Sequence, residues 1–149
     1  MGKFVATMAS ILLMVTAGAD AQPVPAYATS VLVGSWQLVK FQDSTGRTVA
    51  PDNKANYTLA FDAEGQVSLR LDCNRGSGKW ASASKGEVHF GPLALTKAQC
   101  PAGSLHDRLV KDLALVRSYT KQNGFLYLAL VDDGGSYQFE PAGAAAKSN

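Results

Sequence analysis

The sequence predicts an α+β domain dominated by short antiparallel strands, arranged as a curled sheet or small barrel with one amphipathic helix covering an opening. Three observations support this fold class. About seven or eight short runs have the alternation of a strand, clusters of Gly, Asn, Asp and Pro separate them, and a single stretch has helical periodicity. The chain has 149 residues, of which 46% are apolar, and this suits one domain with a packed core.

Residues 1–21 predict a cleavable secretory signal peptide. Lys3 supplies a positive charge, an almost entirely apolar run covers residues 4–17, and Ala19-Asp20-Ala21 fits the small-x-small cleavage pattern. We therefore expect the mature chain to begin at Gln22. The apolar run is shorter than the ~20 residues that cross a bilayer, and no Cys lies near the cleavage point to carry a lipid. The sequence thus predicts an exported protein that does not span the membrane.

The first half of the mature chain predicts an extended lead-in followed by strands. Residues 22–33 begin with two prolines and are expected to form an extended linker. From Gly34 to residue 41, apolar side chains alternate on both faces of a strand, and a turn-rich stretch follows. The hairpin expected next has strands 57–61 and 67–71, joined by a turn over 62–65 in which Gly65 can take a positive φ.

Two glycine-containing segments follow this hairpin. Residues 73–78 (CNRGSG) predict another turn, which leads into a short strand around Trp80. A further strand over 87–95 is interrupted at Gly91-Pro92, and this favours a bulge or an edge position in the sheet.

One helix is expected after Pro101-Ala102-Gly103. Ser104 is a good N-cap, and Asp107 puts a negative charge in the first turn, where the helix dipole favours it. Apolar residues recur at helical spacing at Leu105, Leu109, Leu113 and Val116. The polar side chains that are expected to face solvent are His106, Arg108, Lys111, Asp112 and Arg117.

The C-terminal part predicts a closing hairpin. Asn123-Gly124 is a strong turn signal between alternating runs, and a strand is expected over 125–131. A second turn over 132–135 leads to a last strand over 137–139. Residues 142–149 are expected to form a frayed tail, so the folded domain is placed at 34–141.

Several motifs occur in a recognisable order. They are Gly34-Ser35-Trp36-Gln37-Leu38, Tyr57-Thr58-Leu59-Ala60-Phe61, Cys73-Asn74 with Gly78, and Thr96-Lys97-Ala98-Gln99-Cys100-Pro101. Together they resemble the META domain family, which the heat-shock protein HslJ typifies. The resemblance implies a small barrel-like sheet of lipocalin-like topology with a helix. It also implies a bacterial, often envelope-associated protein connected with heat shock and novobiocin resistance, and it supplies no catalytic residue.

The two cysteines, Cys73 and Cys100, predict a disulfide that ties the 73–78 turn to the segment before the helix. The expected compartment is oxidising, and closing a loop of this length stabilises a fold by roughly 3–4 kcal/mol in the chain-entropy model. Two alternatives are a metal site that recruits His89 and His106, and a redox thiol. The spacing fits no zinc motif and contains no Cys-x-x-Cys.

Other candidate sites have structural explanations. Residues 75–79 (RGSGK) do not fit a phosphate-binding loop, because a strand rather than a helix is expected to follow. Ser104, His106 and Asp107 are nearly consecutive at a helix start, so they are expected to point in different directions rather than form a triad. His89 is expected to be a partly exposed strand residue. The cations expected to be scattered surface charge are Arg70, Arg75, Lys79 and Lys85.

We therefore expect no catalytic residue, cofactor or metal, and a net charge of +2 argues against a nucleic-acid partner. The leading expectation is a non-enzymatic, periplasmic stress-tolerance module that contacts another envelope protein. The alternative is a small-ligand binder that uses the barrel interior or mouth and part of the aromatic set. A hydrolase is the third reading, and it requires a cleft that holds His89 or His106 beside a carboxylate or Ser.

Overall fold

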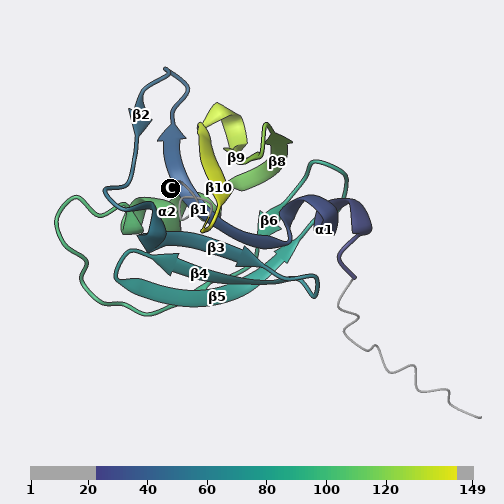
Figure 1. The fold of residues 1–149 in the computed structure, drawn as a ribbon, viewed down its shortest axis with the longest axis horizontal. Coiled ribbons are helices and arrows are strands. Elements are labelled where there is room, and N and C mark those ends of the chain that lie inside the picture. The colour runs from purple at the N-terminus through teal and green to yellow at the C-terminus, as the bar shows by residue number, and fades with distance from the viewer. Residues whose placement is uncertain (1–22, 144–149) are drawn as a thin grey trace, which may run out of the picture.

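A computed structural model describes residues 23–143 as a strongly curved antiparallel sheet with two helices (Figure 1). The helices are α1 (Ala26–Leu32) and α2 (His106–Leu113), with the 3-10 turns η1 (Lys54–Asn56) and η2 (Val131–Asp133). The strands are β1 (Gly34–Gln42), β2 (Thr48–Val49), β3 (Tyr57–Phe61), β4 (Gln66–Leu71), β5 (Asn74–Ala81), β6 (His89–Phe90), β7 (Ala94–Leu95), β8 (Val116–Gln122), β9 (Phe125–Leu130) and β10 (Ser136–Pro141). This confirms the α+β, strand-dominated class. Among the described residues, no helix is long and apolar enough to cross a membrane.

The sheet nearly closes into a barrel. Neighbouring strands are hydrogen-bonded in the order β6-β5-β4-β3-β1-β10-β9-β8, while β2 pairs with β1 and β7 with β5. In Figure 1, β3, β4 and β5 form one side, β8, β9 and β10 form the other, and β1 runs between them. The segment before β6 joins the two ends: the Val88 N–H donates to the Arg117 carbonyl (3.1 Å), and the Tyr119 N–H donates to the Gly86 carbonyl (2.9 Å).

The predicted hairpins form where alternation and turn chemistry agree. In β3 and β4, buried and more exposed residues alternate, and Leu59 lies opposite Leu69. Gly65 takes a φ of 85° in the turn between these strands. Asn123 and Gly124 both have positive φ, 53° and 81°, as the tight turn between β8 and β9 requires. The strand predicted over 87–95 is interrupted as expected, because β6 ends before Gly91-Pro92 and β7 begins after it.

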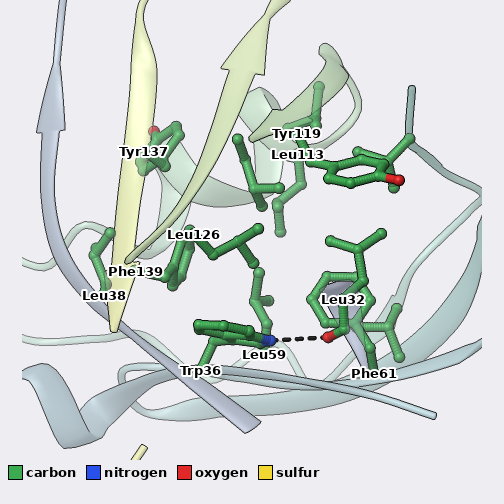
Figure 2. Packing of buried hydrophobic residues seen from close by; sticks show 14 of the residues in the cluster. Leu32, Trp36, Leu38, Leu59, Phe61, Leu113, Tyr119, Leu126, Tyr137 and Phe139 are labelled. Atoms are coloured by element: carbon green, nitrogen blue, oxygen red, sulfur yellow. Dashed lines mark hydrogen bonds between the residues drawn. The ribbon is translucent and has the colours of Figure 1, made fainter. Parts of the chain in front are cut away.

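Side chains fill the interior of the barrel. Figure 2 shows Trp36, Leu59, Leu126 and Phe139 packed together in this core. Helix α2 contributes Leu109 and Leu113, and helix α1 contributes Ala28 and Leu32, all of them buried. Close packing of this kind leaves an eight-stranded barrel little internal space.

The extended conformation predicted for the linker over 22–33 is wrong for its described part, because residues 26–32 form α1. Helix α1 buries Ala28 and Leu32 against the barrel. Its last carbonyl is also used, since the Trp36 indole Nε1–H donates to the Leu32 carbonyl at 2.8 Å (Figure 2). Gln22 and the rest of the predicted signal lie outside the described residues, as does most of the predicted tail.

The turn predicted over 73–78 is also wrong. The turn is confined to Asp72 and Cys73, with Asp72 at a φ of 57°, and β5 begins at Asn74. The glycines serve a different purpose. A Cβ on Gly76 would lie 2.1 Å from the Ala94 carbonyl oxygen, and one on Gly78 would lie 2.6 Å from Leu93 Cδ2. Glycine is therefore needed because the segment around β7, which pairs with β5, approaches this strand closely.

Helix α2 is shorter than its periodicity suggested. Leu105 is the N-cap residue, although Ser104 Oγ still accepts a hydrogen bond from the His106 N–H at 3.2 Å. The helix ends at Leu113, and Val116 belongs to β8, where it is buried. Val116 continues the apolar pattern because the strand that follows the helix enters the same core.

Candidate functional site

The loop over residues 96–105, which leads from β7 to α2, forms the candidate site. Cys100 in this loop is joined to Cys73 by a disulfide, with 5.5 Å between their Cα atoms. Cys73 is exposed and Cys100 is half-buried. The pairing therefore links the loop to the β4–β5 turn, as the sequence predicted.

Asn74, next to the disulfide, holds the same loop through its side chain. Its Oδ1 accepts hydrogen bonds from the Ala98 N–H (2.7 Å) and the Thr96 hydroxyl (2.8 Å), and its Nδ2 donates to the Ala98 carbonyl (2.9 Å). Thr96 Oγ1 in turn accepts from the Arg75 N–H at 3.1 Å. Asn74 has no exposed surface, so its polar atoms depend on these protein partners.

Tyr57 anchors the other end of the loop. Its hydroxyl accepts a hydrogen bond from the Leu105 N–H at 3.0 Å and lies 3.5 Å from Ser104 Oγ. Because the tyrosine ring is buried in the core at the start of β3, the loop is fixed to the barrel where it enters α2. The loop is thus held at Asn74, at the disulfide and at Tyr57.

Between these anchors the loop borders an open hollow of about 570 Å³, which Lys97, Cys100, Ser104, His106 and Asp107 help to line. His106 was expected to face solvent, but its side chain is only 16% exposed. Its Nδ1 lies 2.8 Å from Asp107 Oδ1, and its Nε2 is buried without a hydrogen-bond partner among the described residues. The ring is buried because α2 begins against the loop rather than in open solvent.

The hollow brings Ser104, His106 and Asp107 together without forming a catalytic relay. The His106–Asp107 contact was not expected from their sequence positions. However, Ser104 Oγ is engaged with the His106 N–H and lies near the Tyr57 hydroxyl, and no hydrogen bond joins it to His106 Nε2 in the described structure. The Asp107 side chain is fully exposed. A triad needs a nucleophile bonded to the base and a shielded carboxylate, and neither condition is met.

The second histidine lies elsewhere. His89 is an exposed residue of β6, and it lines a groove at the barrel rim together with Val24, Trp80 and Phe90. It does not line the hollow that contains Cys100 and His106. Within residues 23–143, no group of three or more His, Cys, Asp or Glu side chains is placed to hold a metal ion.

Three of the four basic residues singled out in the sequence lie on the outer face of the sheet, on β4 and β5. Arg70 and Arg75 are directly opposite each other on β4 and β5, and Lys79 is opposite Gln66 farther along the same pair of strands. The Arg70 Nε–H donates to the Asp72 carbonyl at 3.4 Å. Lys85 lies between β5 and β6 and is exposed. The RGSGK segment lies entirely within β5, so it has no phosphate-binding loop geometry.

The sequence did not predict one polar contact, which joins β10 to α2. Tyr137 of β10 donates from its hydroxyl to Asp112 Oδ2 of α2 at 2.6 Å, and Arg108 Nε lies 3.7 Å from the same carboxylate oxygen. Burial and this hydrogen bond raise the pKa of Tyr137 above its usual range. Asp112 was expected to face solvent. In the sequence, only the spacing of four residues between Arg108 and Asp112 indicated that these two side chains could make contact.

The comparisons with known proteins agree with this fold. The family model of the META domain matches residues 29–143. An NMR structure of a protein from Burkholderia xenovorans is similar, with a TM-score of 0.63 and 22% identity over 87% of this chain and 97% of that one. A crystal structure of a DUF4847 family protein from Bacteroides vulgatus has a TM-score of 0.56 and 18% identity over 76% of this chain and 96% of that one. No curated protein matches this chain.

Proposed function

Because this chain belongs to the META domain family, we propose that it is an exported, non-enzymatic module that binds another protein of the bacterial cell envelope and supports stress tolerance. The observation that carries the proposal is the filled barrel interior. Trp36, Leu126 and Phe139 pack across it, and this leaves the outer surface for function. The connection of this family with heat shock and novobiocin resistance supports the stress role.

The loop over 96–105 is the surface that we assign to the contact. Lys97 and Gln99 are exposed, while Asn74 and Tyr57 hold the loop on which they lie. A surface that is already ordered loses less conformational entropy on binding than a mobile one. The hollow beside it offers a partner a concave, polar surface.

A pull-down from envelope extracts with the mature protein tests this assignment. We expect the wild type to retain a specific envelope protein and Lys97→Glu to lose it, because the substitution reverses a charge on the contact loop. Lys79→Glu is the matched control, since it makes the same change on the outer face of β5. If both variants retain equal amounts of the envelope protein, the loop is not part of the interface. A deletion strain with unchanged tolerance to heat and novobiocin would contradict the stress role.

A small-ligand binder remains the second candidate, supported by one observation. A groove of about 450 Å³ at the barrel rim is lined by the apolar side chains of Val24, Trp80 and Phe90. A fatty acid bound there would change the fluorescence of Trp80, and Phe90→Ser would weaken that response. Absence of any saturable change at millimolar fatty acid would exclude this groove as a ligand site for that class.

The hydrolase reading also has a direct test. The hollow holds His106 beside the Asp107 carboxylate, which is the arrangement that this reading requires. We expect no ester hydrolysis above that of the Ser104→Ala variant, because Ser104 Oγ is not bonded to His106 Nε2. Turnover of p-nitrophenyl acetate that depends on both Ser104 and His106 would contradict the non-enzymatic proposal.

A further inference from the structure

The amide of Asn74 lies at both sulfur atoms of the disulfide. Its Nδ2 is 3.5 Å from Cys73 Sγ and 3.5 Å from Cys100 Sγ, and it also donates to the Ala98 carbonyl at 2.9 Å. An amide nitrogen carries two N–H donors. One is used by Ala98, and the other is directed toward the sulfur pair.

A donor at this position favours the thiolate form of cysteine. When a disulfide is cleaved, one sulfur leaves with a negative charge, and an N–H group near it stabilises that charge. Asn74 has no exposed surface, so water does not compete for this hydrogen bond. The sulfur atoms of an intact disulfide are only weak acceptors, so this donor contributes more to a thiolate than to the disulfide.

The surrounding loop also suits the reduced protein. Cys73 Sγ lies 3.6 Å from the Ala98 carbonyl oxygen, a distance at which a Cys73 thiol can donate to that oxygen. The hydrogen bond from the Ala98 N–H to Asn74 Oδ1 does not involve sulfur, so it survives reduction. Asn74 therefore keeps Cys73 and Cys100 close together, and the disulfide can form again.

Access differs between the two sulfurs. Cys73 is exposed, whereas Cys100 is half-buried and lines the hollow of about 570 Å³. An incoming thiol therefore reaches Cys73 more easily. The hollow provides room beside the disulfide for the segment of a partner that carries this thiol.

We propose that Cys73–Cys100 is a reversible redox site that exchanges with a dithiol protein, and that Asn74 is the positioning residue that stabilises the departing sulfur. A thiolate of the partner attacks Cys73 Sγ, the S–S bond breaks, and Cys100 leaves with the electron pair as a thiolate. The second thiolate of the partner then attacks the mixed disulfide and releases Cys73. Two electrons pass to this protein, the partner becomes a disulfide, and the two protons lost by its thiols are balanced by two taken up here. The inference goes beyond the proposed function and does not depend on it.

Equilibration of the mature protein with glutathione redox buffers tests the inference. We expect the wild type to populate both oxidised and reduced forms and to keep its near-UV circular dichroism when reduced. Asn74→Asp removes the N–H donors and adds a negative charge, so it is expected to shift the equilibrium toward the disulfide by about tenfold. Thr96→Val is the matched control, because it loosens the same loop without changing the group that faces the sulfurs.

Three results would overturn the redox site: a wild type that stays fully oxidised in every glutathione buffer, one that unfolds on reduction, or equal equilibrium constants for Asn74→Asp and Thr96→Val. If Asn74→Asp does not fold, alkylation of the reduced wild type decides the question. We expect Cys100 to react with iodoacetamide at neutral pH several times faster than in the urea-unfolded chain. Equal rates would contradict the role of Asn74. No envelope protein is used, so these outcomes are independent of the pull-down.

Discussion

The Asn74 side chain makes two hydrogen bonds with the backbone of Ala98: its Oδ1 accepts from the Ala98 N–H, and its Nδ2 donates to the Ala98 carbonyl. A neighbouring strand would make the same pair of bonds with Ala98. A carboxamide has the same donor and acceptor groups as a peptide unit, so it can replace one where the loop cannot continue the sheet. The Thr96 hydroxyl donates a second hydrogen bond to Asn74 Oδ1. This explains in physical terms why the Cys-Asn turn and the Thr-x-x-x-Cys-Pro segment occur in one chain.

Tyr137→Phe tests the hydrogen bond between β10 and α2. The change removes the donor to Asp112, whose side chain is 13% exposed, and we expect a loss of about 1.5–3 kcal/mol in the free energy of unfolding. Urea denaturation measures it. Tyr127→Phe is the control, since within the described part of the chain its hydroxyl makes no hydrogen bond with another side chain or the backbone. A loss at Tyr137 no larger than at Tyr127 would show that the pair contributes nothing.

Asp43 carries a prediction about pH. Hydrogen bonds from the Thr45 hydroxyl, and from the Arg47 and Thr45 N–H groups, lower its pKa from 3.8 to about 2. Because the folded-state pKa is the lower one, ionised Asp43 stabilises the folded protein above pH 3.8, and this contribution disappears as the pH falls through about 2. NMR titration of the carboxyl carbon should give this value, and Thr45→Ala should raise it. An unchanged pKa in Thr45→Ala would contradict the stated cause.

At the scale of the element, helix α1 shows how tertiary packing overrides local preference. A helix of seven residues is too short to be stable alone in water, and Pro23 and Pro25 precede it. It forms because Ala28 and Leu32 are buried and because Trp36 bonds its last carbonyl. Helix α1 is therefore stabilised by its packing against the barrel.

Trp36→Phe tests how α1 is held. The ring is retained in part, but the Leu32 carbonyl loses its donor, so we expect faster amide hydrogen exchange over residues 26–32 and a loss of about 1 kcal/mol in overall stability. Trp80→Phe is the control, because its indole donates to the Asp62 carbonyl at 3.2 Å rather than to a carbonyl of α1. Exchange over 26–32 that accelerates equally in both variants would indicate a general loss of stability rather than release of α1.

Gly76→Ala tests the close approach of β7 to β5. The new Cβ would lie 2.1 Å from the Ala94 carbonyl oxygen and 2.7 Å from Leu95 Cδ2, so the β7 segment must move. We expect a loss of about 1–3 kcal/mol, the usual cost of overpacking. Thermal unfolding measures it against Ser77→Ala, which changes an exposed position of the same strand. Stabilities within about 0.5 kcal/mol of each other would contradict the close approach.

At the scale of the whole molecule, barrel closure and the disulfide are separate restraints. The barrel closes through hydrogen bonds between residues 86–88 and β8, whereas the disulfide ties a loop outside the strand ring. Loss of the disulfide should therefore reduce stability without opening the barrel.

Thiol titration and reduction test this separation. The denatured, unreduced protein should contain no free thiol, and two free thiols would eliminate the Cys73–Cys100 pair. Reduction is expected to lower the free energy of unfolding by roughly 3–4 kcal/mol, because the unfolded chain regains the entropy of the closed loop. Unfolding of the reduced and oxidised forms in urea measures the difference. A reduced form without tertiary circular dichroism would show that the barrel depends on the disulfide.

The sequence by itself determined the features that depend on near neighbours. Alternation predicted β3, β4 and β9, and Asn123-Gly124 predicted a tight turn, because the period of two and a positive φ are properties of a few adjacent residues. The spacing of Leu105, Leu109 and Leu113 likewise predicted α2. The motifs around Cys73 and Cys100 identified the family for the same reason, since each is a short continuous segment.

Only the tertiary structure decided the features that depend on distant residues. Residues 26–32 became a helix because Ala28 and Leu32 are buried in the core of the barrel. Residues 74–78 became a strand rather than a turn because they pair with β4 and β7. His106 and Asp112 were expected in solvent but are largely covered, since the faces of a short helix are assigned by what packs against them. The partners of Asn74 in the loop before α2 lie 22 to 26 positions away, and no local period encodes such a contact.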